Sequence, residues 1–295
     1  MELLRSRRDL ARLPARGAGQ PALVLVPTMG ALHAGHLSLV EQARAWGTVV
    51  VSIFVNPLQF GPGEDYSHYP RDLDRDLALL QPLDVAAVFA PDAADIFPRQ
   101  DAVTVSPGPA ARFLCGASRP GHFQGVLTVV AKLLHLVQPQ VAVFGRKDAQ
   151  QCLVIAEMVR DLDFPVRLVD LPTVREPDGL AMSSRNAYLS VEERRRAGCL
   201  SEALQQARQA LARGERLTDR LREILRSRLA AADQVEYAEV CRVPDLQIPH
   251  EATGHLLLAA AVRIGRTRLI DNLVVRVSAT GIRDVPLLAA GESEP

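Results

Sequence analysis

The stretch A-L-V-L-V-P-T-M-G-A-L-H-A-G-H, residues 22–36, predicts how this chain folds. Its first five residues, Ala22–Val26, are all apolar, which is typical of a strand buried on both faces of a parallel sheet. Gly30 and Gly35 follow, and a helical pattern begins near His36. A buried strand that passes through a glycine-bearing turn into a helix indicates an α/β architecture.

The same alternation of strand and helix continues to about residue 175. Valine-rich runs without polar alternation recur at Thr48–Val55, Asp84–Ala90, Val141–Phe144 and Val166–Leu171. Helical patterns lie between them at about His36–Trp46, Leu73–Leu80 and Gln124–Val137. This order requires right-handed crossovers. Residues 1–174 are therefore predicted to form a Rossmann-like domain with a doubly wound parallel sheet.

The pattern changes after Pro172. Ser190, followed three residues later by Glu193, is a capping-box signature, and Gly214 then separates two helical patterns. The runs 255–262 and 267–275, joined through Gly265, are typical of a β-hairpin. We expect residues 175–295 to form a smaller α+β domain that closes as a lid, with a loose tail from about Ser278.

Composition excludes several classes of protein. Of the 295 residues 48% are hydrophobic, and 34 basic residues balance 34 acidic ones. Binding to nucleic acid or to a membrane surface needs a positive excess, so neither is expected as a partner. The four scattered cysteines form no C-x-x-C pair, and no signal peptide or membrane span is indicated. These features favour a cytoplasmic protein with reduced thiols.

Polar residues that follow the predicted strands are the first candidates for a site, because ligands of open parallel sheets bind beyond the carboxyl ends of the strands. His33 and His36 lie three residues apart at the start of a helix, where exposed amides attract phosphate. The alternatives are a pair of surface histidines or a zinc pair. The sequence has no H-E-x-x-H motif and no obvious third zinc ligand.

Two further segments follow later strands. In F-V-N-P-L-Q-F-G, residues 54–61, the amides of Asn56 and Gln59 suit a small hydroxylated or carboxylated substrate, although Asn-Pro is also an ordinary turn signal. In F-G-R-K-D-A-Q-Q, residues 144–151, Lys147 could place a charge on a phosphate, with Gln151 one helical turn beyond it. A solvent-facing lysine is the alternative reading, and Asp148 would also fit a helix cap.

A fourth polar segment, M-S-S-R-N at residues 182–186, lies near the predicted domain boundary. Its two hydroxyls and its guanidinium would make a phosphate clamp if a linker carried them over a cleft. The alternative is a polar loop before the Ser190 cap.

Together these segments resemble the pantothenate synthetase (pantoate–β-alanine ligase) family of the H-x-G-H nucleotidyltransferases. The resemblance is dense from about Ala22 to Ser190 and returns more weakly at R-L-I-D-N, residues 268–272. It rests on P-T-M-G-A-L-H-x-G-H, F-V-N-P-L-Q-F, Y-P-R, G-H-F-x-G-V-x-T-V-V, F-G-x-K-D-x-Q-Q and M-S-S-R-N. H-x-G-H alone is unspecific, but six motifs in the expected order are not a chance match.

The resemblance implies a two-step ligase reaction. Pantoate attacks the α-phosphorus of ATP to give pantoyl adenylate and pyrophosphate, and β-alanine then displaces AMP. It also implies Mg²⁺ and a homodimer. The residues implied for ATP are Met29, His33, His36, Gly145, Lys147, Asp148, Val174, Met182, Ser183, Ser184 and Arg185, of which His33, His36, Lys147 and Arg185 would be catalytic. Those implied for pantoate are Asn56, Gln59, Arg119 and Gln151, and Asp76 is implied for the metal.

Three positions depart from the family pattern. Arg146 stands where glutamate is common, Ala149 where tyrosine is common, and Arg75 where an acidic residue is common. Arg75 weakens the expected metal position most, because the acidic residues of this stretch are expected to support magnesium. A magnesium ion held mainly by ATP phosphates and water would tolerate the change.

Two rival functions remain open from the sequence. A related nucleotidyltransferase would lack the paired Gln59 and Gln151 and would favour cations for a second phosphate. A regulatory nucleotide-binding protein without catalysis would be expected to have lost His36 or Lys147, and both are present.

Overall fold

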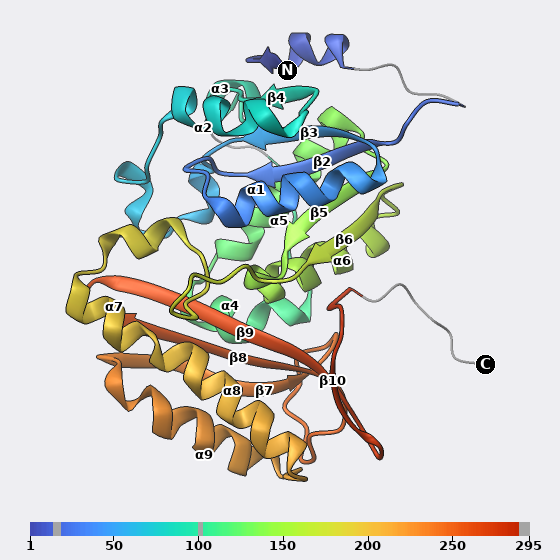
Figure 1. Cartoon of the computed structure of the whole chain (residues 1–295). Coiled ribbons are helices and arrows are strands. Elements are labelled where there is room, and N and C mark those ends of the chain that lie inside the picture. Colours follow the sequence, from blue (N-terminus) through green and yellow to red (C-terminus); the bar gives the residue numbers. More distant parts are fainter. Residues whose placement is uncertain (14–18, 100–102, 289–295) are drawn as a thin grey trace. The chain divides into compact units, whose positions relative to one another are not determined.

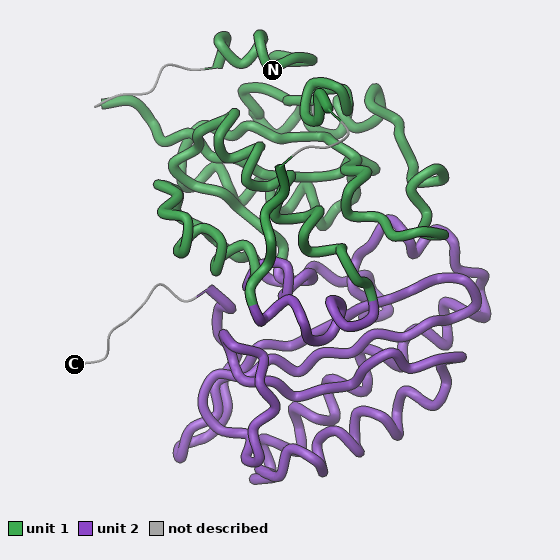
Figure 2. The backbone as a smooth tube through the Cα atoms, turned by 180° about the vertical axis from the view of Figure 1, so that it is seen from behind, with its two compact units in different colours: residues 1–108, 119–145, 154–171 green, residues 109–118, 146–153, 172–295 purple. Residues whose placement is uncertain are grey.

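The computed structural model describes residues 1–13, 19–99 and 103–288, which form two compact units (Figure 2). Unit 1 contains residues 1–108, 119–145 and 154–171, and unit 2 contains residues 109–118, 146–153 and 172–295. The division is therefore not a single cut in the chain. Two short segments that precede residue 172, 109–118 and 146–153, cluster with the C-terminal residues.

Unit 1 is built on a six-stranded sheet in the order β1-β4-β3-β2-β5-β6, in which all neighbouring strands are parallel (Figure 1). Its strands are β1 (Glu2–Leu4), β2 (Leu23–Thr28), β3 (Thr48–Ile53), β4 (Ala87–Phe89), β5 (Val141–Gly145) and β6 (Arg167–Leu171). The chain winds outward from β2 through β3 to β4 and then returns to add β5 and β6 on the other side. This confirms the predicted doubly wound sheet.

The strands of unit 1 are apolar on both faces because helices cover both. Val24 and Val26 of β2 pack in one core cluster with Leu39 and Val40, and Leu25, which points to the other face, is equally buried. The α-helices of this part of the chain are α1 (Ala34–Ala43), α2 (Leu73–Leu80), α3 (Ala93–Ile96), α5 (His122–Val137) and α6 (Ala149–Asp161). Only the second half of α6 belongs to unit 1.

Two details differ from the sequence-based expectation. The edge strand β1 was not expected, because three residues are too short to show a pattern, yet Leu4 is fully buried where β1 pairs with β4. Helix α1 begins at Ala34 rather than near His36. The reason is local, since His33 is the N-cap and its Nδ1 accepts a hydrogen bond from the Gly35 amide at 3.2 Å.

Unit 2 contains an antiparallel sheet in the order β10-β9-β8-β7. Its strands are β7 (Gln234–Arg242), β8 (Gly254–Ile264), β9 (Thr267–Ser278) and β10 (Gly281–Asp284), and its helices are α4 (Leu114–Ser118), α7 (Val191–Ala197), α8 (Cys199–Ala212) and α9 (Thr218–Arg228). The predicted capping box is present, because Ser190 Oγ accepts from the Glu193 amide and Glu193 accepts from the Ser190 amide. Leucines and alanines of α8 and α9 share one core with β8 and β9.

The expected loose tail from about Ser278 is wrong for residues 281–284, which form β10 and pair with β9.

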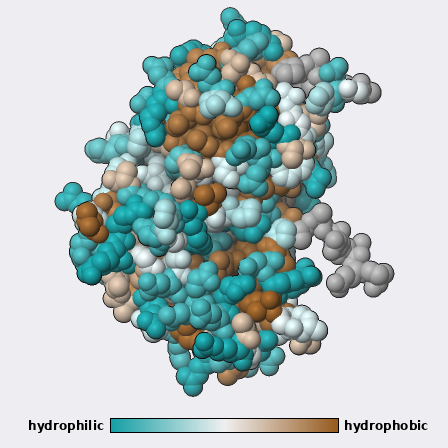
Figure 3. Space-filling model, viewed as in Figure 1, coloured by the Kyte–Doolittle hydropathy of each residue, from teal (hydrophilic) through white to brown (hydrophobic). Residues whose placement is uncertain are grey.

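Figure 3 shows many hydrophilic residues over α8 and α9, as expected for helices with one buried face. Acidic residues pair with arginines on the helices of this unit, among them Glu192 with Arg195 on α7 and Asp219 with Arg222 on α9. Within the described ranges, no helix is both long and apolar enough to cross a membrane.

Candidate active site

Two imidazoles lie together just beyond β2. His33 caps α1 and His36 lies in the first turn of that helix, so their ring centroids are 4.0 Å apart. Free amides and the positive end of the helix dipole favour an anion at such a place. The two rings therefore add donors to a helix start that already suits a phosphate.

The turn between β2 and α1 is held by a carboxylate from another helix. Asp76 of α2 accepts hydrogen bonds from the amide of Ala31 at 2.9 Å and from the amide of Leu32 at 2.8 Å. Gly30 and Ala31 both have positive φ, +75° and +50°. A Cβ at position 30 would lie only 2.8 Å from Asp76 Oδ2, so this position requires glycine.

Asp76 is a buried acid, with 1% of its surface exposed. Burial raises the pKa of its carboxyl group, and the hydrogen bonds from Leu32 and Ala31 offset part of that rise. Arg75 approaches the same turn, because its Nη1 donates to the Leu32 carbonyl at 3.3 Å. Arg75, which departs from the family pattern, thus contacts the carbonyl of Leu32, and Asp76 binds the amide of the same residue.

These contacts bear on the metal expected at Asp76. Both of its oxygens already accept backbone amides, and Arg75 Nη1 lies 3.9 Å from one of them. Across the part of the chain that the structure describes, no group of three or more His, Cys, Asp or Glu residues could hold a metal. The residues do not fit a magnesium site built by the protein. The geometry instead makes Asp76 a positioning residue for the turn.

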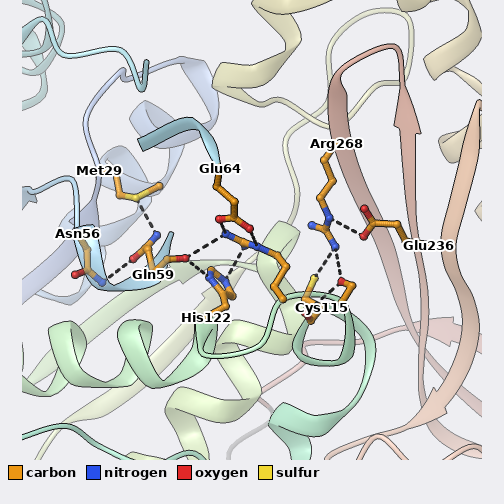
Figure 4. Close-up of polar contacts among 10 residues, drawn as sticks. Met29, Asn56, Gln59, Glu64, Cys115, His122, Glu236 and Arg268 are labelled. Carbon is orange, nitrogen blue, oxygen red and sulfur yellow. Dashed lines mark hydrogen bonds and ion pairs between the residues drawn. The ribbon is translucent and has the colours of Figure 1, made fainter. Parts of the chain in front are cut away.

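A buried amide network follows β3. Asn56, with 1% of its surface exposed, donates to Gln59 Oε1 at 3.0 Å (Figure 4). It also donates to the Gly125 carbonyl at 3.1 Å. Gln59, at the end of the 3-10 helix η3 (Pro57–Gln59), places its Nε2 2.9 Å from Met29 Sδ. The network orients Gln59 and brings Met29, Asn56 and Gln59 to one place in unit 1.

Arg119 joins this network through the backbone. Its Nη2 donates to the Gln59 carbonyl at 3.2 Å, and its Nε donates to Glu64 at 2.7 Å (Figure 4). His122 lies 3.0 Å from Arg119 and 2.8 Å from the same carbonyl. Burial alone would raise the pKa of Glu64, but the hydrogen bond and charge of Arg119 lower it below its usual value. Glu64 was not expected from the sequence.

In unit 2 the expected phosphate lysine lies on the 3-10 helix η7 (Arg146–Asp148), directly after β5. Lys147 is half-buried, and its backbone carbonyl accepts a hydrogen bond from Asn272 Nδ2 at 2.9 Å. Lys147 and Lys132 are the only two lysines of the chain. The half-buried Gln151 stands beside Gln150, which is buried and binds the backbone of residues 110–115.

The segment 182–186 combines half-buried polar groups with a structural asparagine. Ser183 caps the 3-10 helix η8 (Ser184–Tyr188) by accepting from the Arg185 amide, and the Met182 amide donates to the Val174 carbonyl. Asn186 is buried and donates to Glu176 at 2.6 Å. Ser183, Ser184 and Arg185 keep partial exposure.

The segment R-L-I-D-N, residues 268–272, contains polar residues for which the sequence predicted no role. Arg268 donates to Glu236 at 2.8 Å and lies 3.5 Å from Cys115 Sγ (Figure 4). The hydroxyl of Tyr237 lies 3.1 Å from the same sulfur, and burial raises the pKa of that phenol well above its usual value. The neighbouring residues Asp271 and Asn272 are both buried.

The two units each hold a share of the expected residues. Unit 1 contains Met29, His33, His36, Asn56, Gln59, Asp76, Arg119 and Gly145. Unit 2 contains Lys147, Asp148, Gln151, Val174, Met182, Ser183, Ser184 and Arg185. Within unit 1 the structure brings His33 to His36, and Met29, Asn56 and Arg119 to Gln59.

A doubly wound parallel sheet whose strand ends carry histidines, amides and a lysine defines an α/β enzyme that acts on small polar substrates. The family model for pantoate-beta-alanine ligase matches residues 2–274. The chain belongs to this family of ligases.

Relatives and solved structures agree with that assignment. The chain is 47% identical to the pantothenate synthetase of Desulfitobacterium hafniense over 91% of its own length and 95% of the relative's. It is 52% identical to the pantothenate synthetase of Roseiflexus sp. over 88% of its own length and 95% of the relative's. A pantothenate synthetase structure from Thermus thermophilus matches with TM-score 0.88 at 46% identity. The match covers 92% of this chain and 99% of that one.

A second structure carries ligands. The pantoate-beta-alanine ligase of Francisella tularensis, complexed with beta-gamma ATP and beta-alanine, matches with TM-score 0.77 at 34% identity, over 93% of this chain and 97% of that one.

Proposed function

We propose that this enzyme condenses pantoate with β-alanine through a pantoyl adenylate, consuming ATP and releasing AMP and pyrophosphate. The observation that carries the proposal is the pair of imidazoles, 4.0 Å apart, at the start of the ten-residue helix α1 just beyond β2. A helix start with two added donors suits a triphosphate. The ligands of the Francisella relative support ATP and β-alanine as substrates here.

In the first step a carboxylate oxygen of pantoate forms a bond to the α-phosphorus, and the bond from that phosphorus to the pyrophosphate oxygen breaks. Negative charge grows on the α-phosphate and on the leaving group. Fixed donors aimed at that charge lower the barrier. We assign this role to His33, His36 and Lys147, with Ser183, Ser184 and Arg185 as the clamp on the phosphates. Gly145, Asp148, Val174 and Met182 are assigned to the rest of the nucleotide.

Pantoate is assigned to the amide network of unit 1. Gln59 is oriented by Asn56, and Arg119 binds the Gln59 carbonyl, so the hydroxyls and carboxylate of a small acid would meet pre-oriented donors and acceptors. Gln151 of α6 completes this assignment, and Met29 lies against Gln59 near the reacting carboxylate.

In the second step the neutral amine of β-alanine forms a bond to the acyl carbon. The bond from that carbon to the AMP oxygen then breaks, and the amine proton passes to solvent. The acyl adenylate is a mixed anhydride that water would hydrolyse. A lid formed by residues 175–295 would protect it by excluding water.

Three expectations accompany the reaction. Mg²⁺ is expected to be held by ATP phosphates and water, since Asp76 serves the turn of residues 30–32. The family resemblance leads us to expect a homodimer. A cytoplasmic location is consistent with four cysteines that are all free and buried.

Exchange of labelled pyrophosphate into ATP tests the function. We expect exchange that requires pantoate and proceeds without β-alanine, because adenylation precedes entry of the amine. Exchange that ignores pantoate, or that needs a phosphate-bearing second substrate instead, would show a different nucleotidyltransferase.

A further inference from the structure

Two neighbouring residues in the middle of β9 carry polar side chains into the interior. Asp271 and Asn272 are exposed by only 2% and 6%. Burial of a carboxylate or an amide is costly unless the group is hydrogen-bonded. The proposed chemistry uses neither residue, so their partners indicate what they do.

Asn272 holds the turn that carries Lys147. Its Nδ2 donates to the carbonyl of Arg146 at 3.0 Å and to the carbonyl of Lys147 at 2.9 Å. Two bonds from one amide group to successive carbonyls fix the orientation of both peptide units. A lysine side chain is long and flexible, so the direction in which its charge points depends on the backbone from which it starts.

Asp271 holds a different loop, because successive side chains of a strand point to opposite faces. It receives both arms of the Arg175 guanidinium, at 2.6 and 3.0 Å. Arg175 also donates to the Gly179 carbonyl and forms an antiparallel bridge with Ala181. The segment 175–181 is therefore closed on itself and fastened to β9, and residues 182–185 follow it directly.

We propose that Asp271 and Asn272 are positioning residues that aim the two phosphate-binding segments of unit 2. Asn272 acts through the backbone of Lys147. Asp271 acts through Arg175 on the segment from Met182 to Arg185. One dipeptide on a rigid strand thus sets the placement of both, and this inference rests on the proposed function of those segments.

A double-mutant cycle tests the role of Asn272. Asn272→Asp replaces a donor with a carboxylate facing two carbonyls, and it should weaken binding of α,β-methylene ATP and slow pantoate-dependent exchange. We expect about a tenfold to hundredfold loss in exchange, the size of effect that a misplaced group produces. In a Lys147→Ala background the same change should have little further effect. Gln205→Glu, the same chemical change on the exposed side of α8, is the matched control.

A purely structural role predicts a different result. Asn272→Asp would then lower the unfolding temperature and reduce activity by the same factor with and without Lys147, which would overturn the inference. Should the aspartate variant not fold, Asn272→Ser, which keeps one uncharged donor, enters the same cycle with the same two outcomes. For Asp271 the corresponding cycle pairs Asp271→Asn with Arg185→Ala. We expect Asp271→Asn to have little further effect once Arg185 is replaced.

The binding arm keeps the two proposals apart. Wild-type protein that binds α,β-methylene ATP but shows no pantoate-dependent exchange contradicts the proposed function, while the binding cycle still decides the role of Asn272. Wild-type exchange with independent effects of Asn272→Asp and Lys147→Ala contradicts only the present inference.

Discussion

The carboxylate of Asp76 accepts a hydrogen bond from the backbone amide of Leu32 at 2.8 Å, although 44 residues separate the two in the chain. The neighbouring amide of Ala31 binds the other oxygen. The turn has two residues of positive φ, a conformation that costs free energy for alanine. The buried acid offsets that cost and sets where the following His33 begins α1.

Replacing Asp76 with asparagine should therefore impair catalysis. An asparagine can accept from only one of the two amides, and its NH2 group would face the other. A buried amide without an acceptor costs about 1–3 kcal/mol. We expect a comparable loss in the free energy of unfolding and about a tenfold to hundredfold fall in pantoate-dependent exchange, as for other misplaced groups.

Asp74→Asn, an exposed change on the same helix, is the control for Asp76→Asn. A magnesium titration separates the two possible roles of Asp76. A positioning role leaves the half-maximal Mg²⁺ concentration unchanged, whereas a metal ligand would raise it. An Asp76→Asn enzyme as active as the Asp74→Asn enzyme would contradict both roles.

Lys147→Ala should slow adenylation without unfolding the protein. The loss of one donor to transition-state charge typically costs about 2.7–4 kcal/mol, or about a hundredfold to a thousandfold in rate. Lys147→Arg should restore little, because a planar guanidinium does not replace a compact ammonium. Single-turnover formation of the adenylate measures the effect. Lys132→Ala, at the only other lysine, is the control, and equal rates for the two alanine variants would make Lys147 an ordinary surface residue.

Gln59→Ala should weaken pantoate binding more than ATP binding. The substitution removes the amide that Asn56 orients, while the imidazoles of α1 remain. Isothermal titration with each ligand gives the two affinities. Gln124→Ala, at an exposed glutamine of α5, should leave both unchanged. A larger loss for ATP than for pantoate would exchange the two proposed binding regions.

The architecture was predictable because it depends on regular patterns. Strands buried on both faces leave valine runs such as the one at residues 49–51, and a helix start leaves a cap such as Ser190 with Glu193. The short strand β1 and the late strand β10 carry no such pattern. Each is defined by its partner strand, β4 or β9, and a pairing between distant residues is not visible in a local stretch of sequence.

The site residues were predictable as candidates, but the residues that hold them in position were not. Asp76 was expected near a metal because the family resemblance implies that acidic residues of this stretch support magnesium. Only the fold brings its oxygens to the amides of residues 31 and 32. The role of Asn272 likewise depends on a turn 125 residues away in the chain. Motifs identify chemically active side chains, whereas the groups that position them are set by tertiary contacts.

The ion pair between Glu64 and Arg119 should make stability depend on pH in a defined direction. Despite the opposing effect of burial, Arg119 lowers the pKa of Glu64 below its ordinary value of 4.5. A depressed acid contributes stability that is present above the unfolded-state pKa and is lost as pH falls through the lower folded-state pKa. Thermal unfolding of wild type and Glu64→Gln should therefore differ at neutral pH and converge once the pH falls below the lowered folded-state pKa of Glu64. Glu41→Gln, at an exposed residue of α1, should follow wild type throughout. A difference that persists or widens in acid would show that the Glu64 charge does not stabilise the fold, because protonated glutamate and glutamine then carry the same charge.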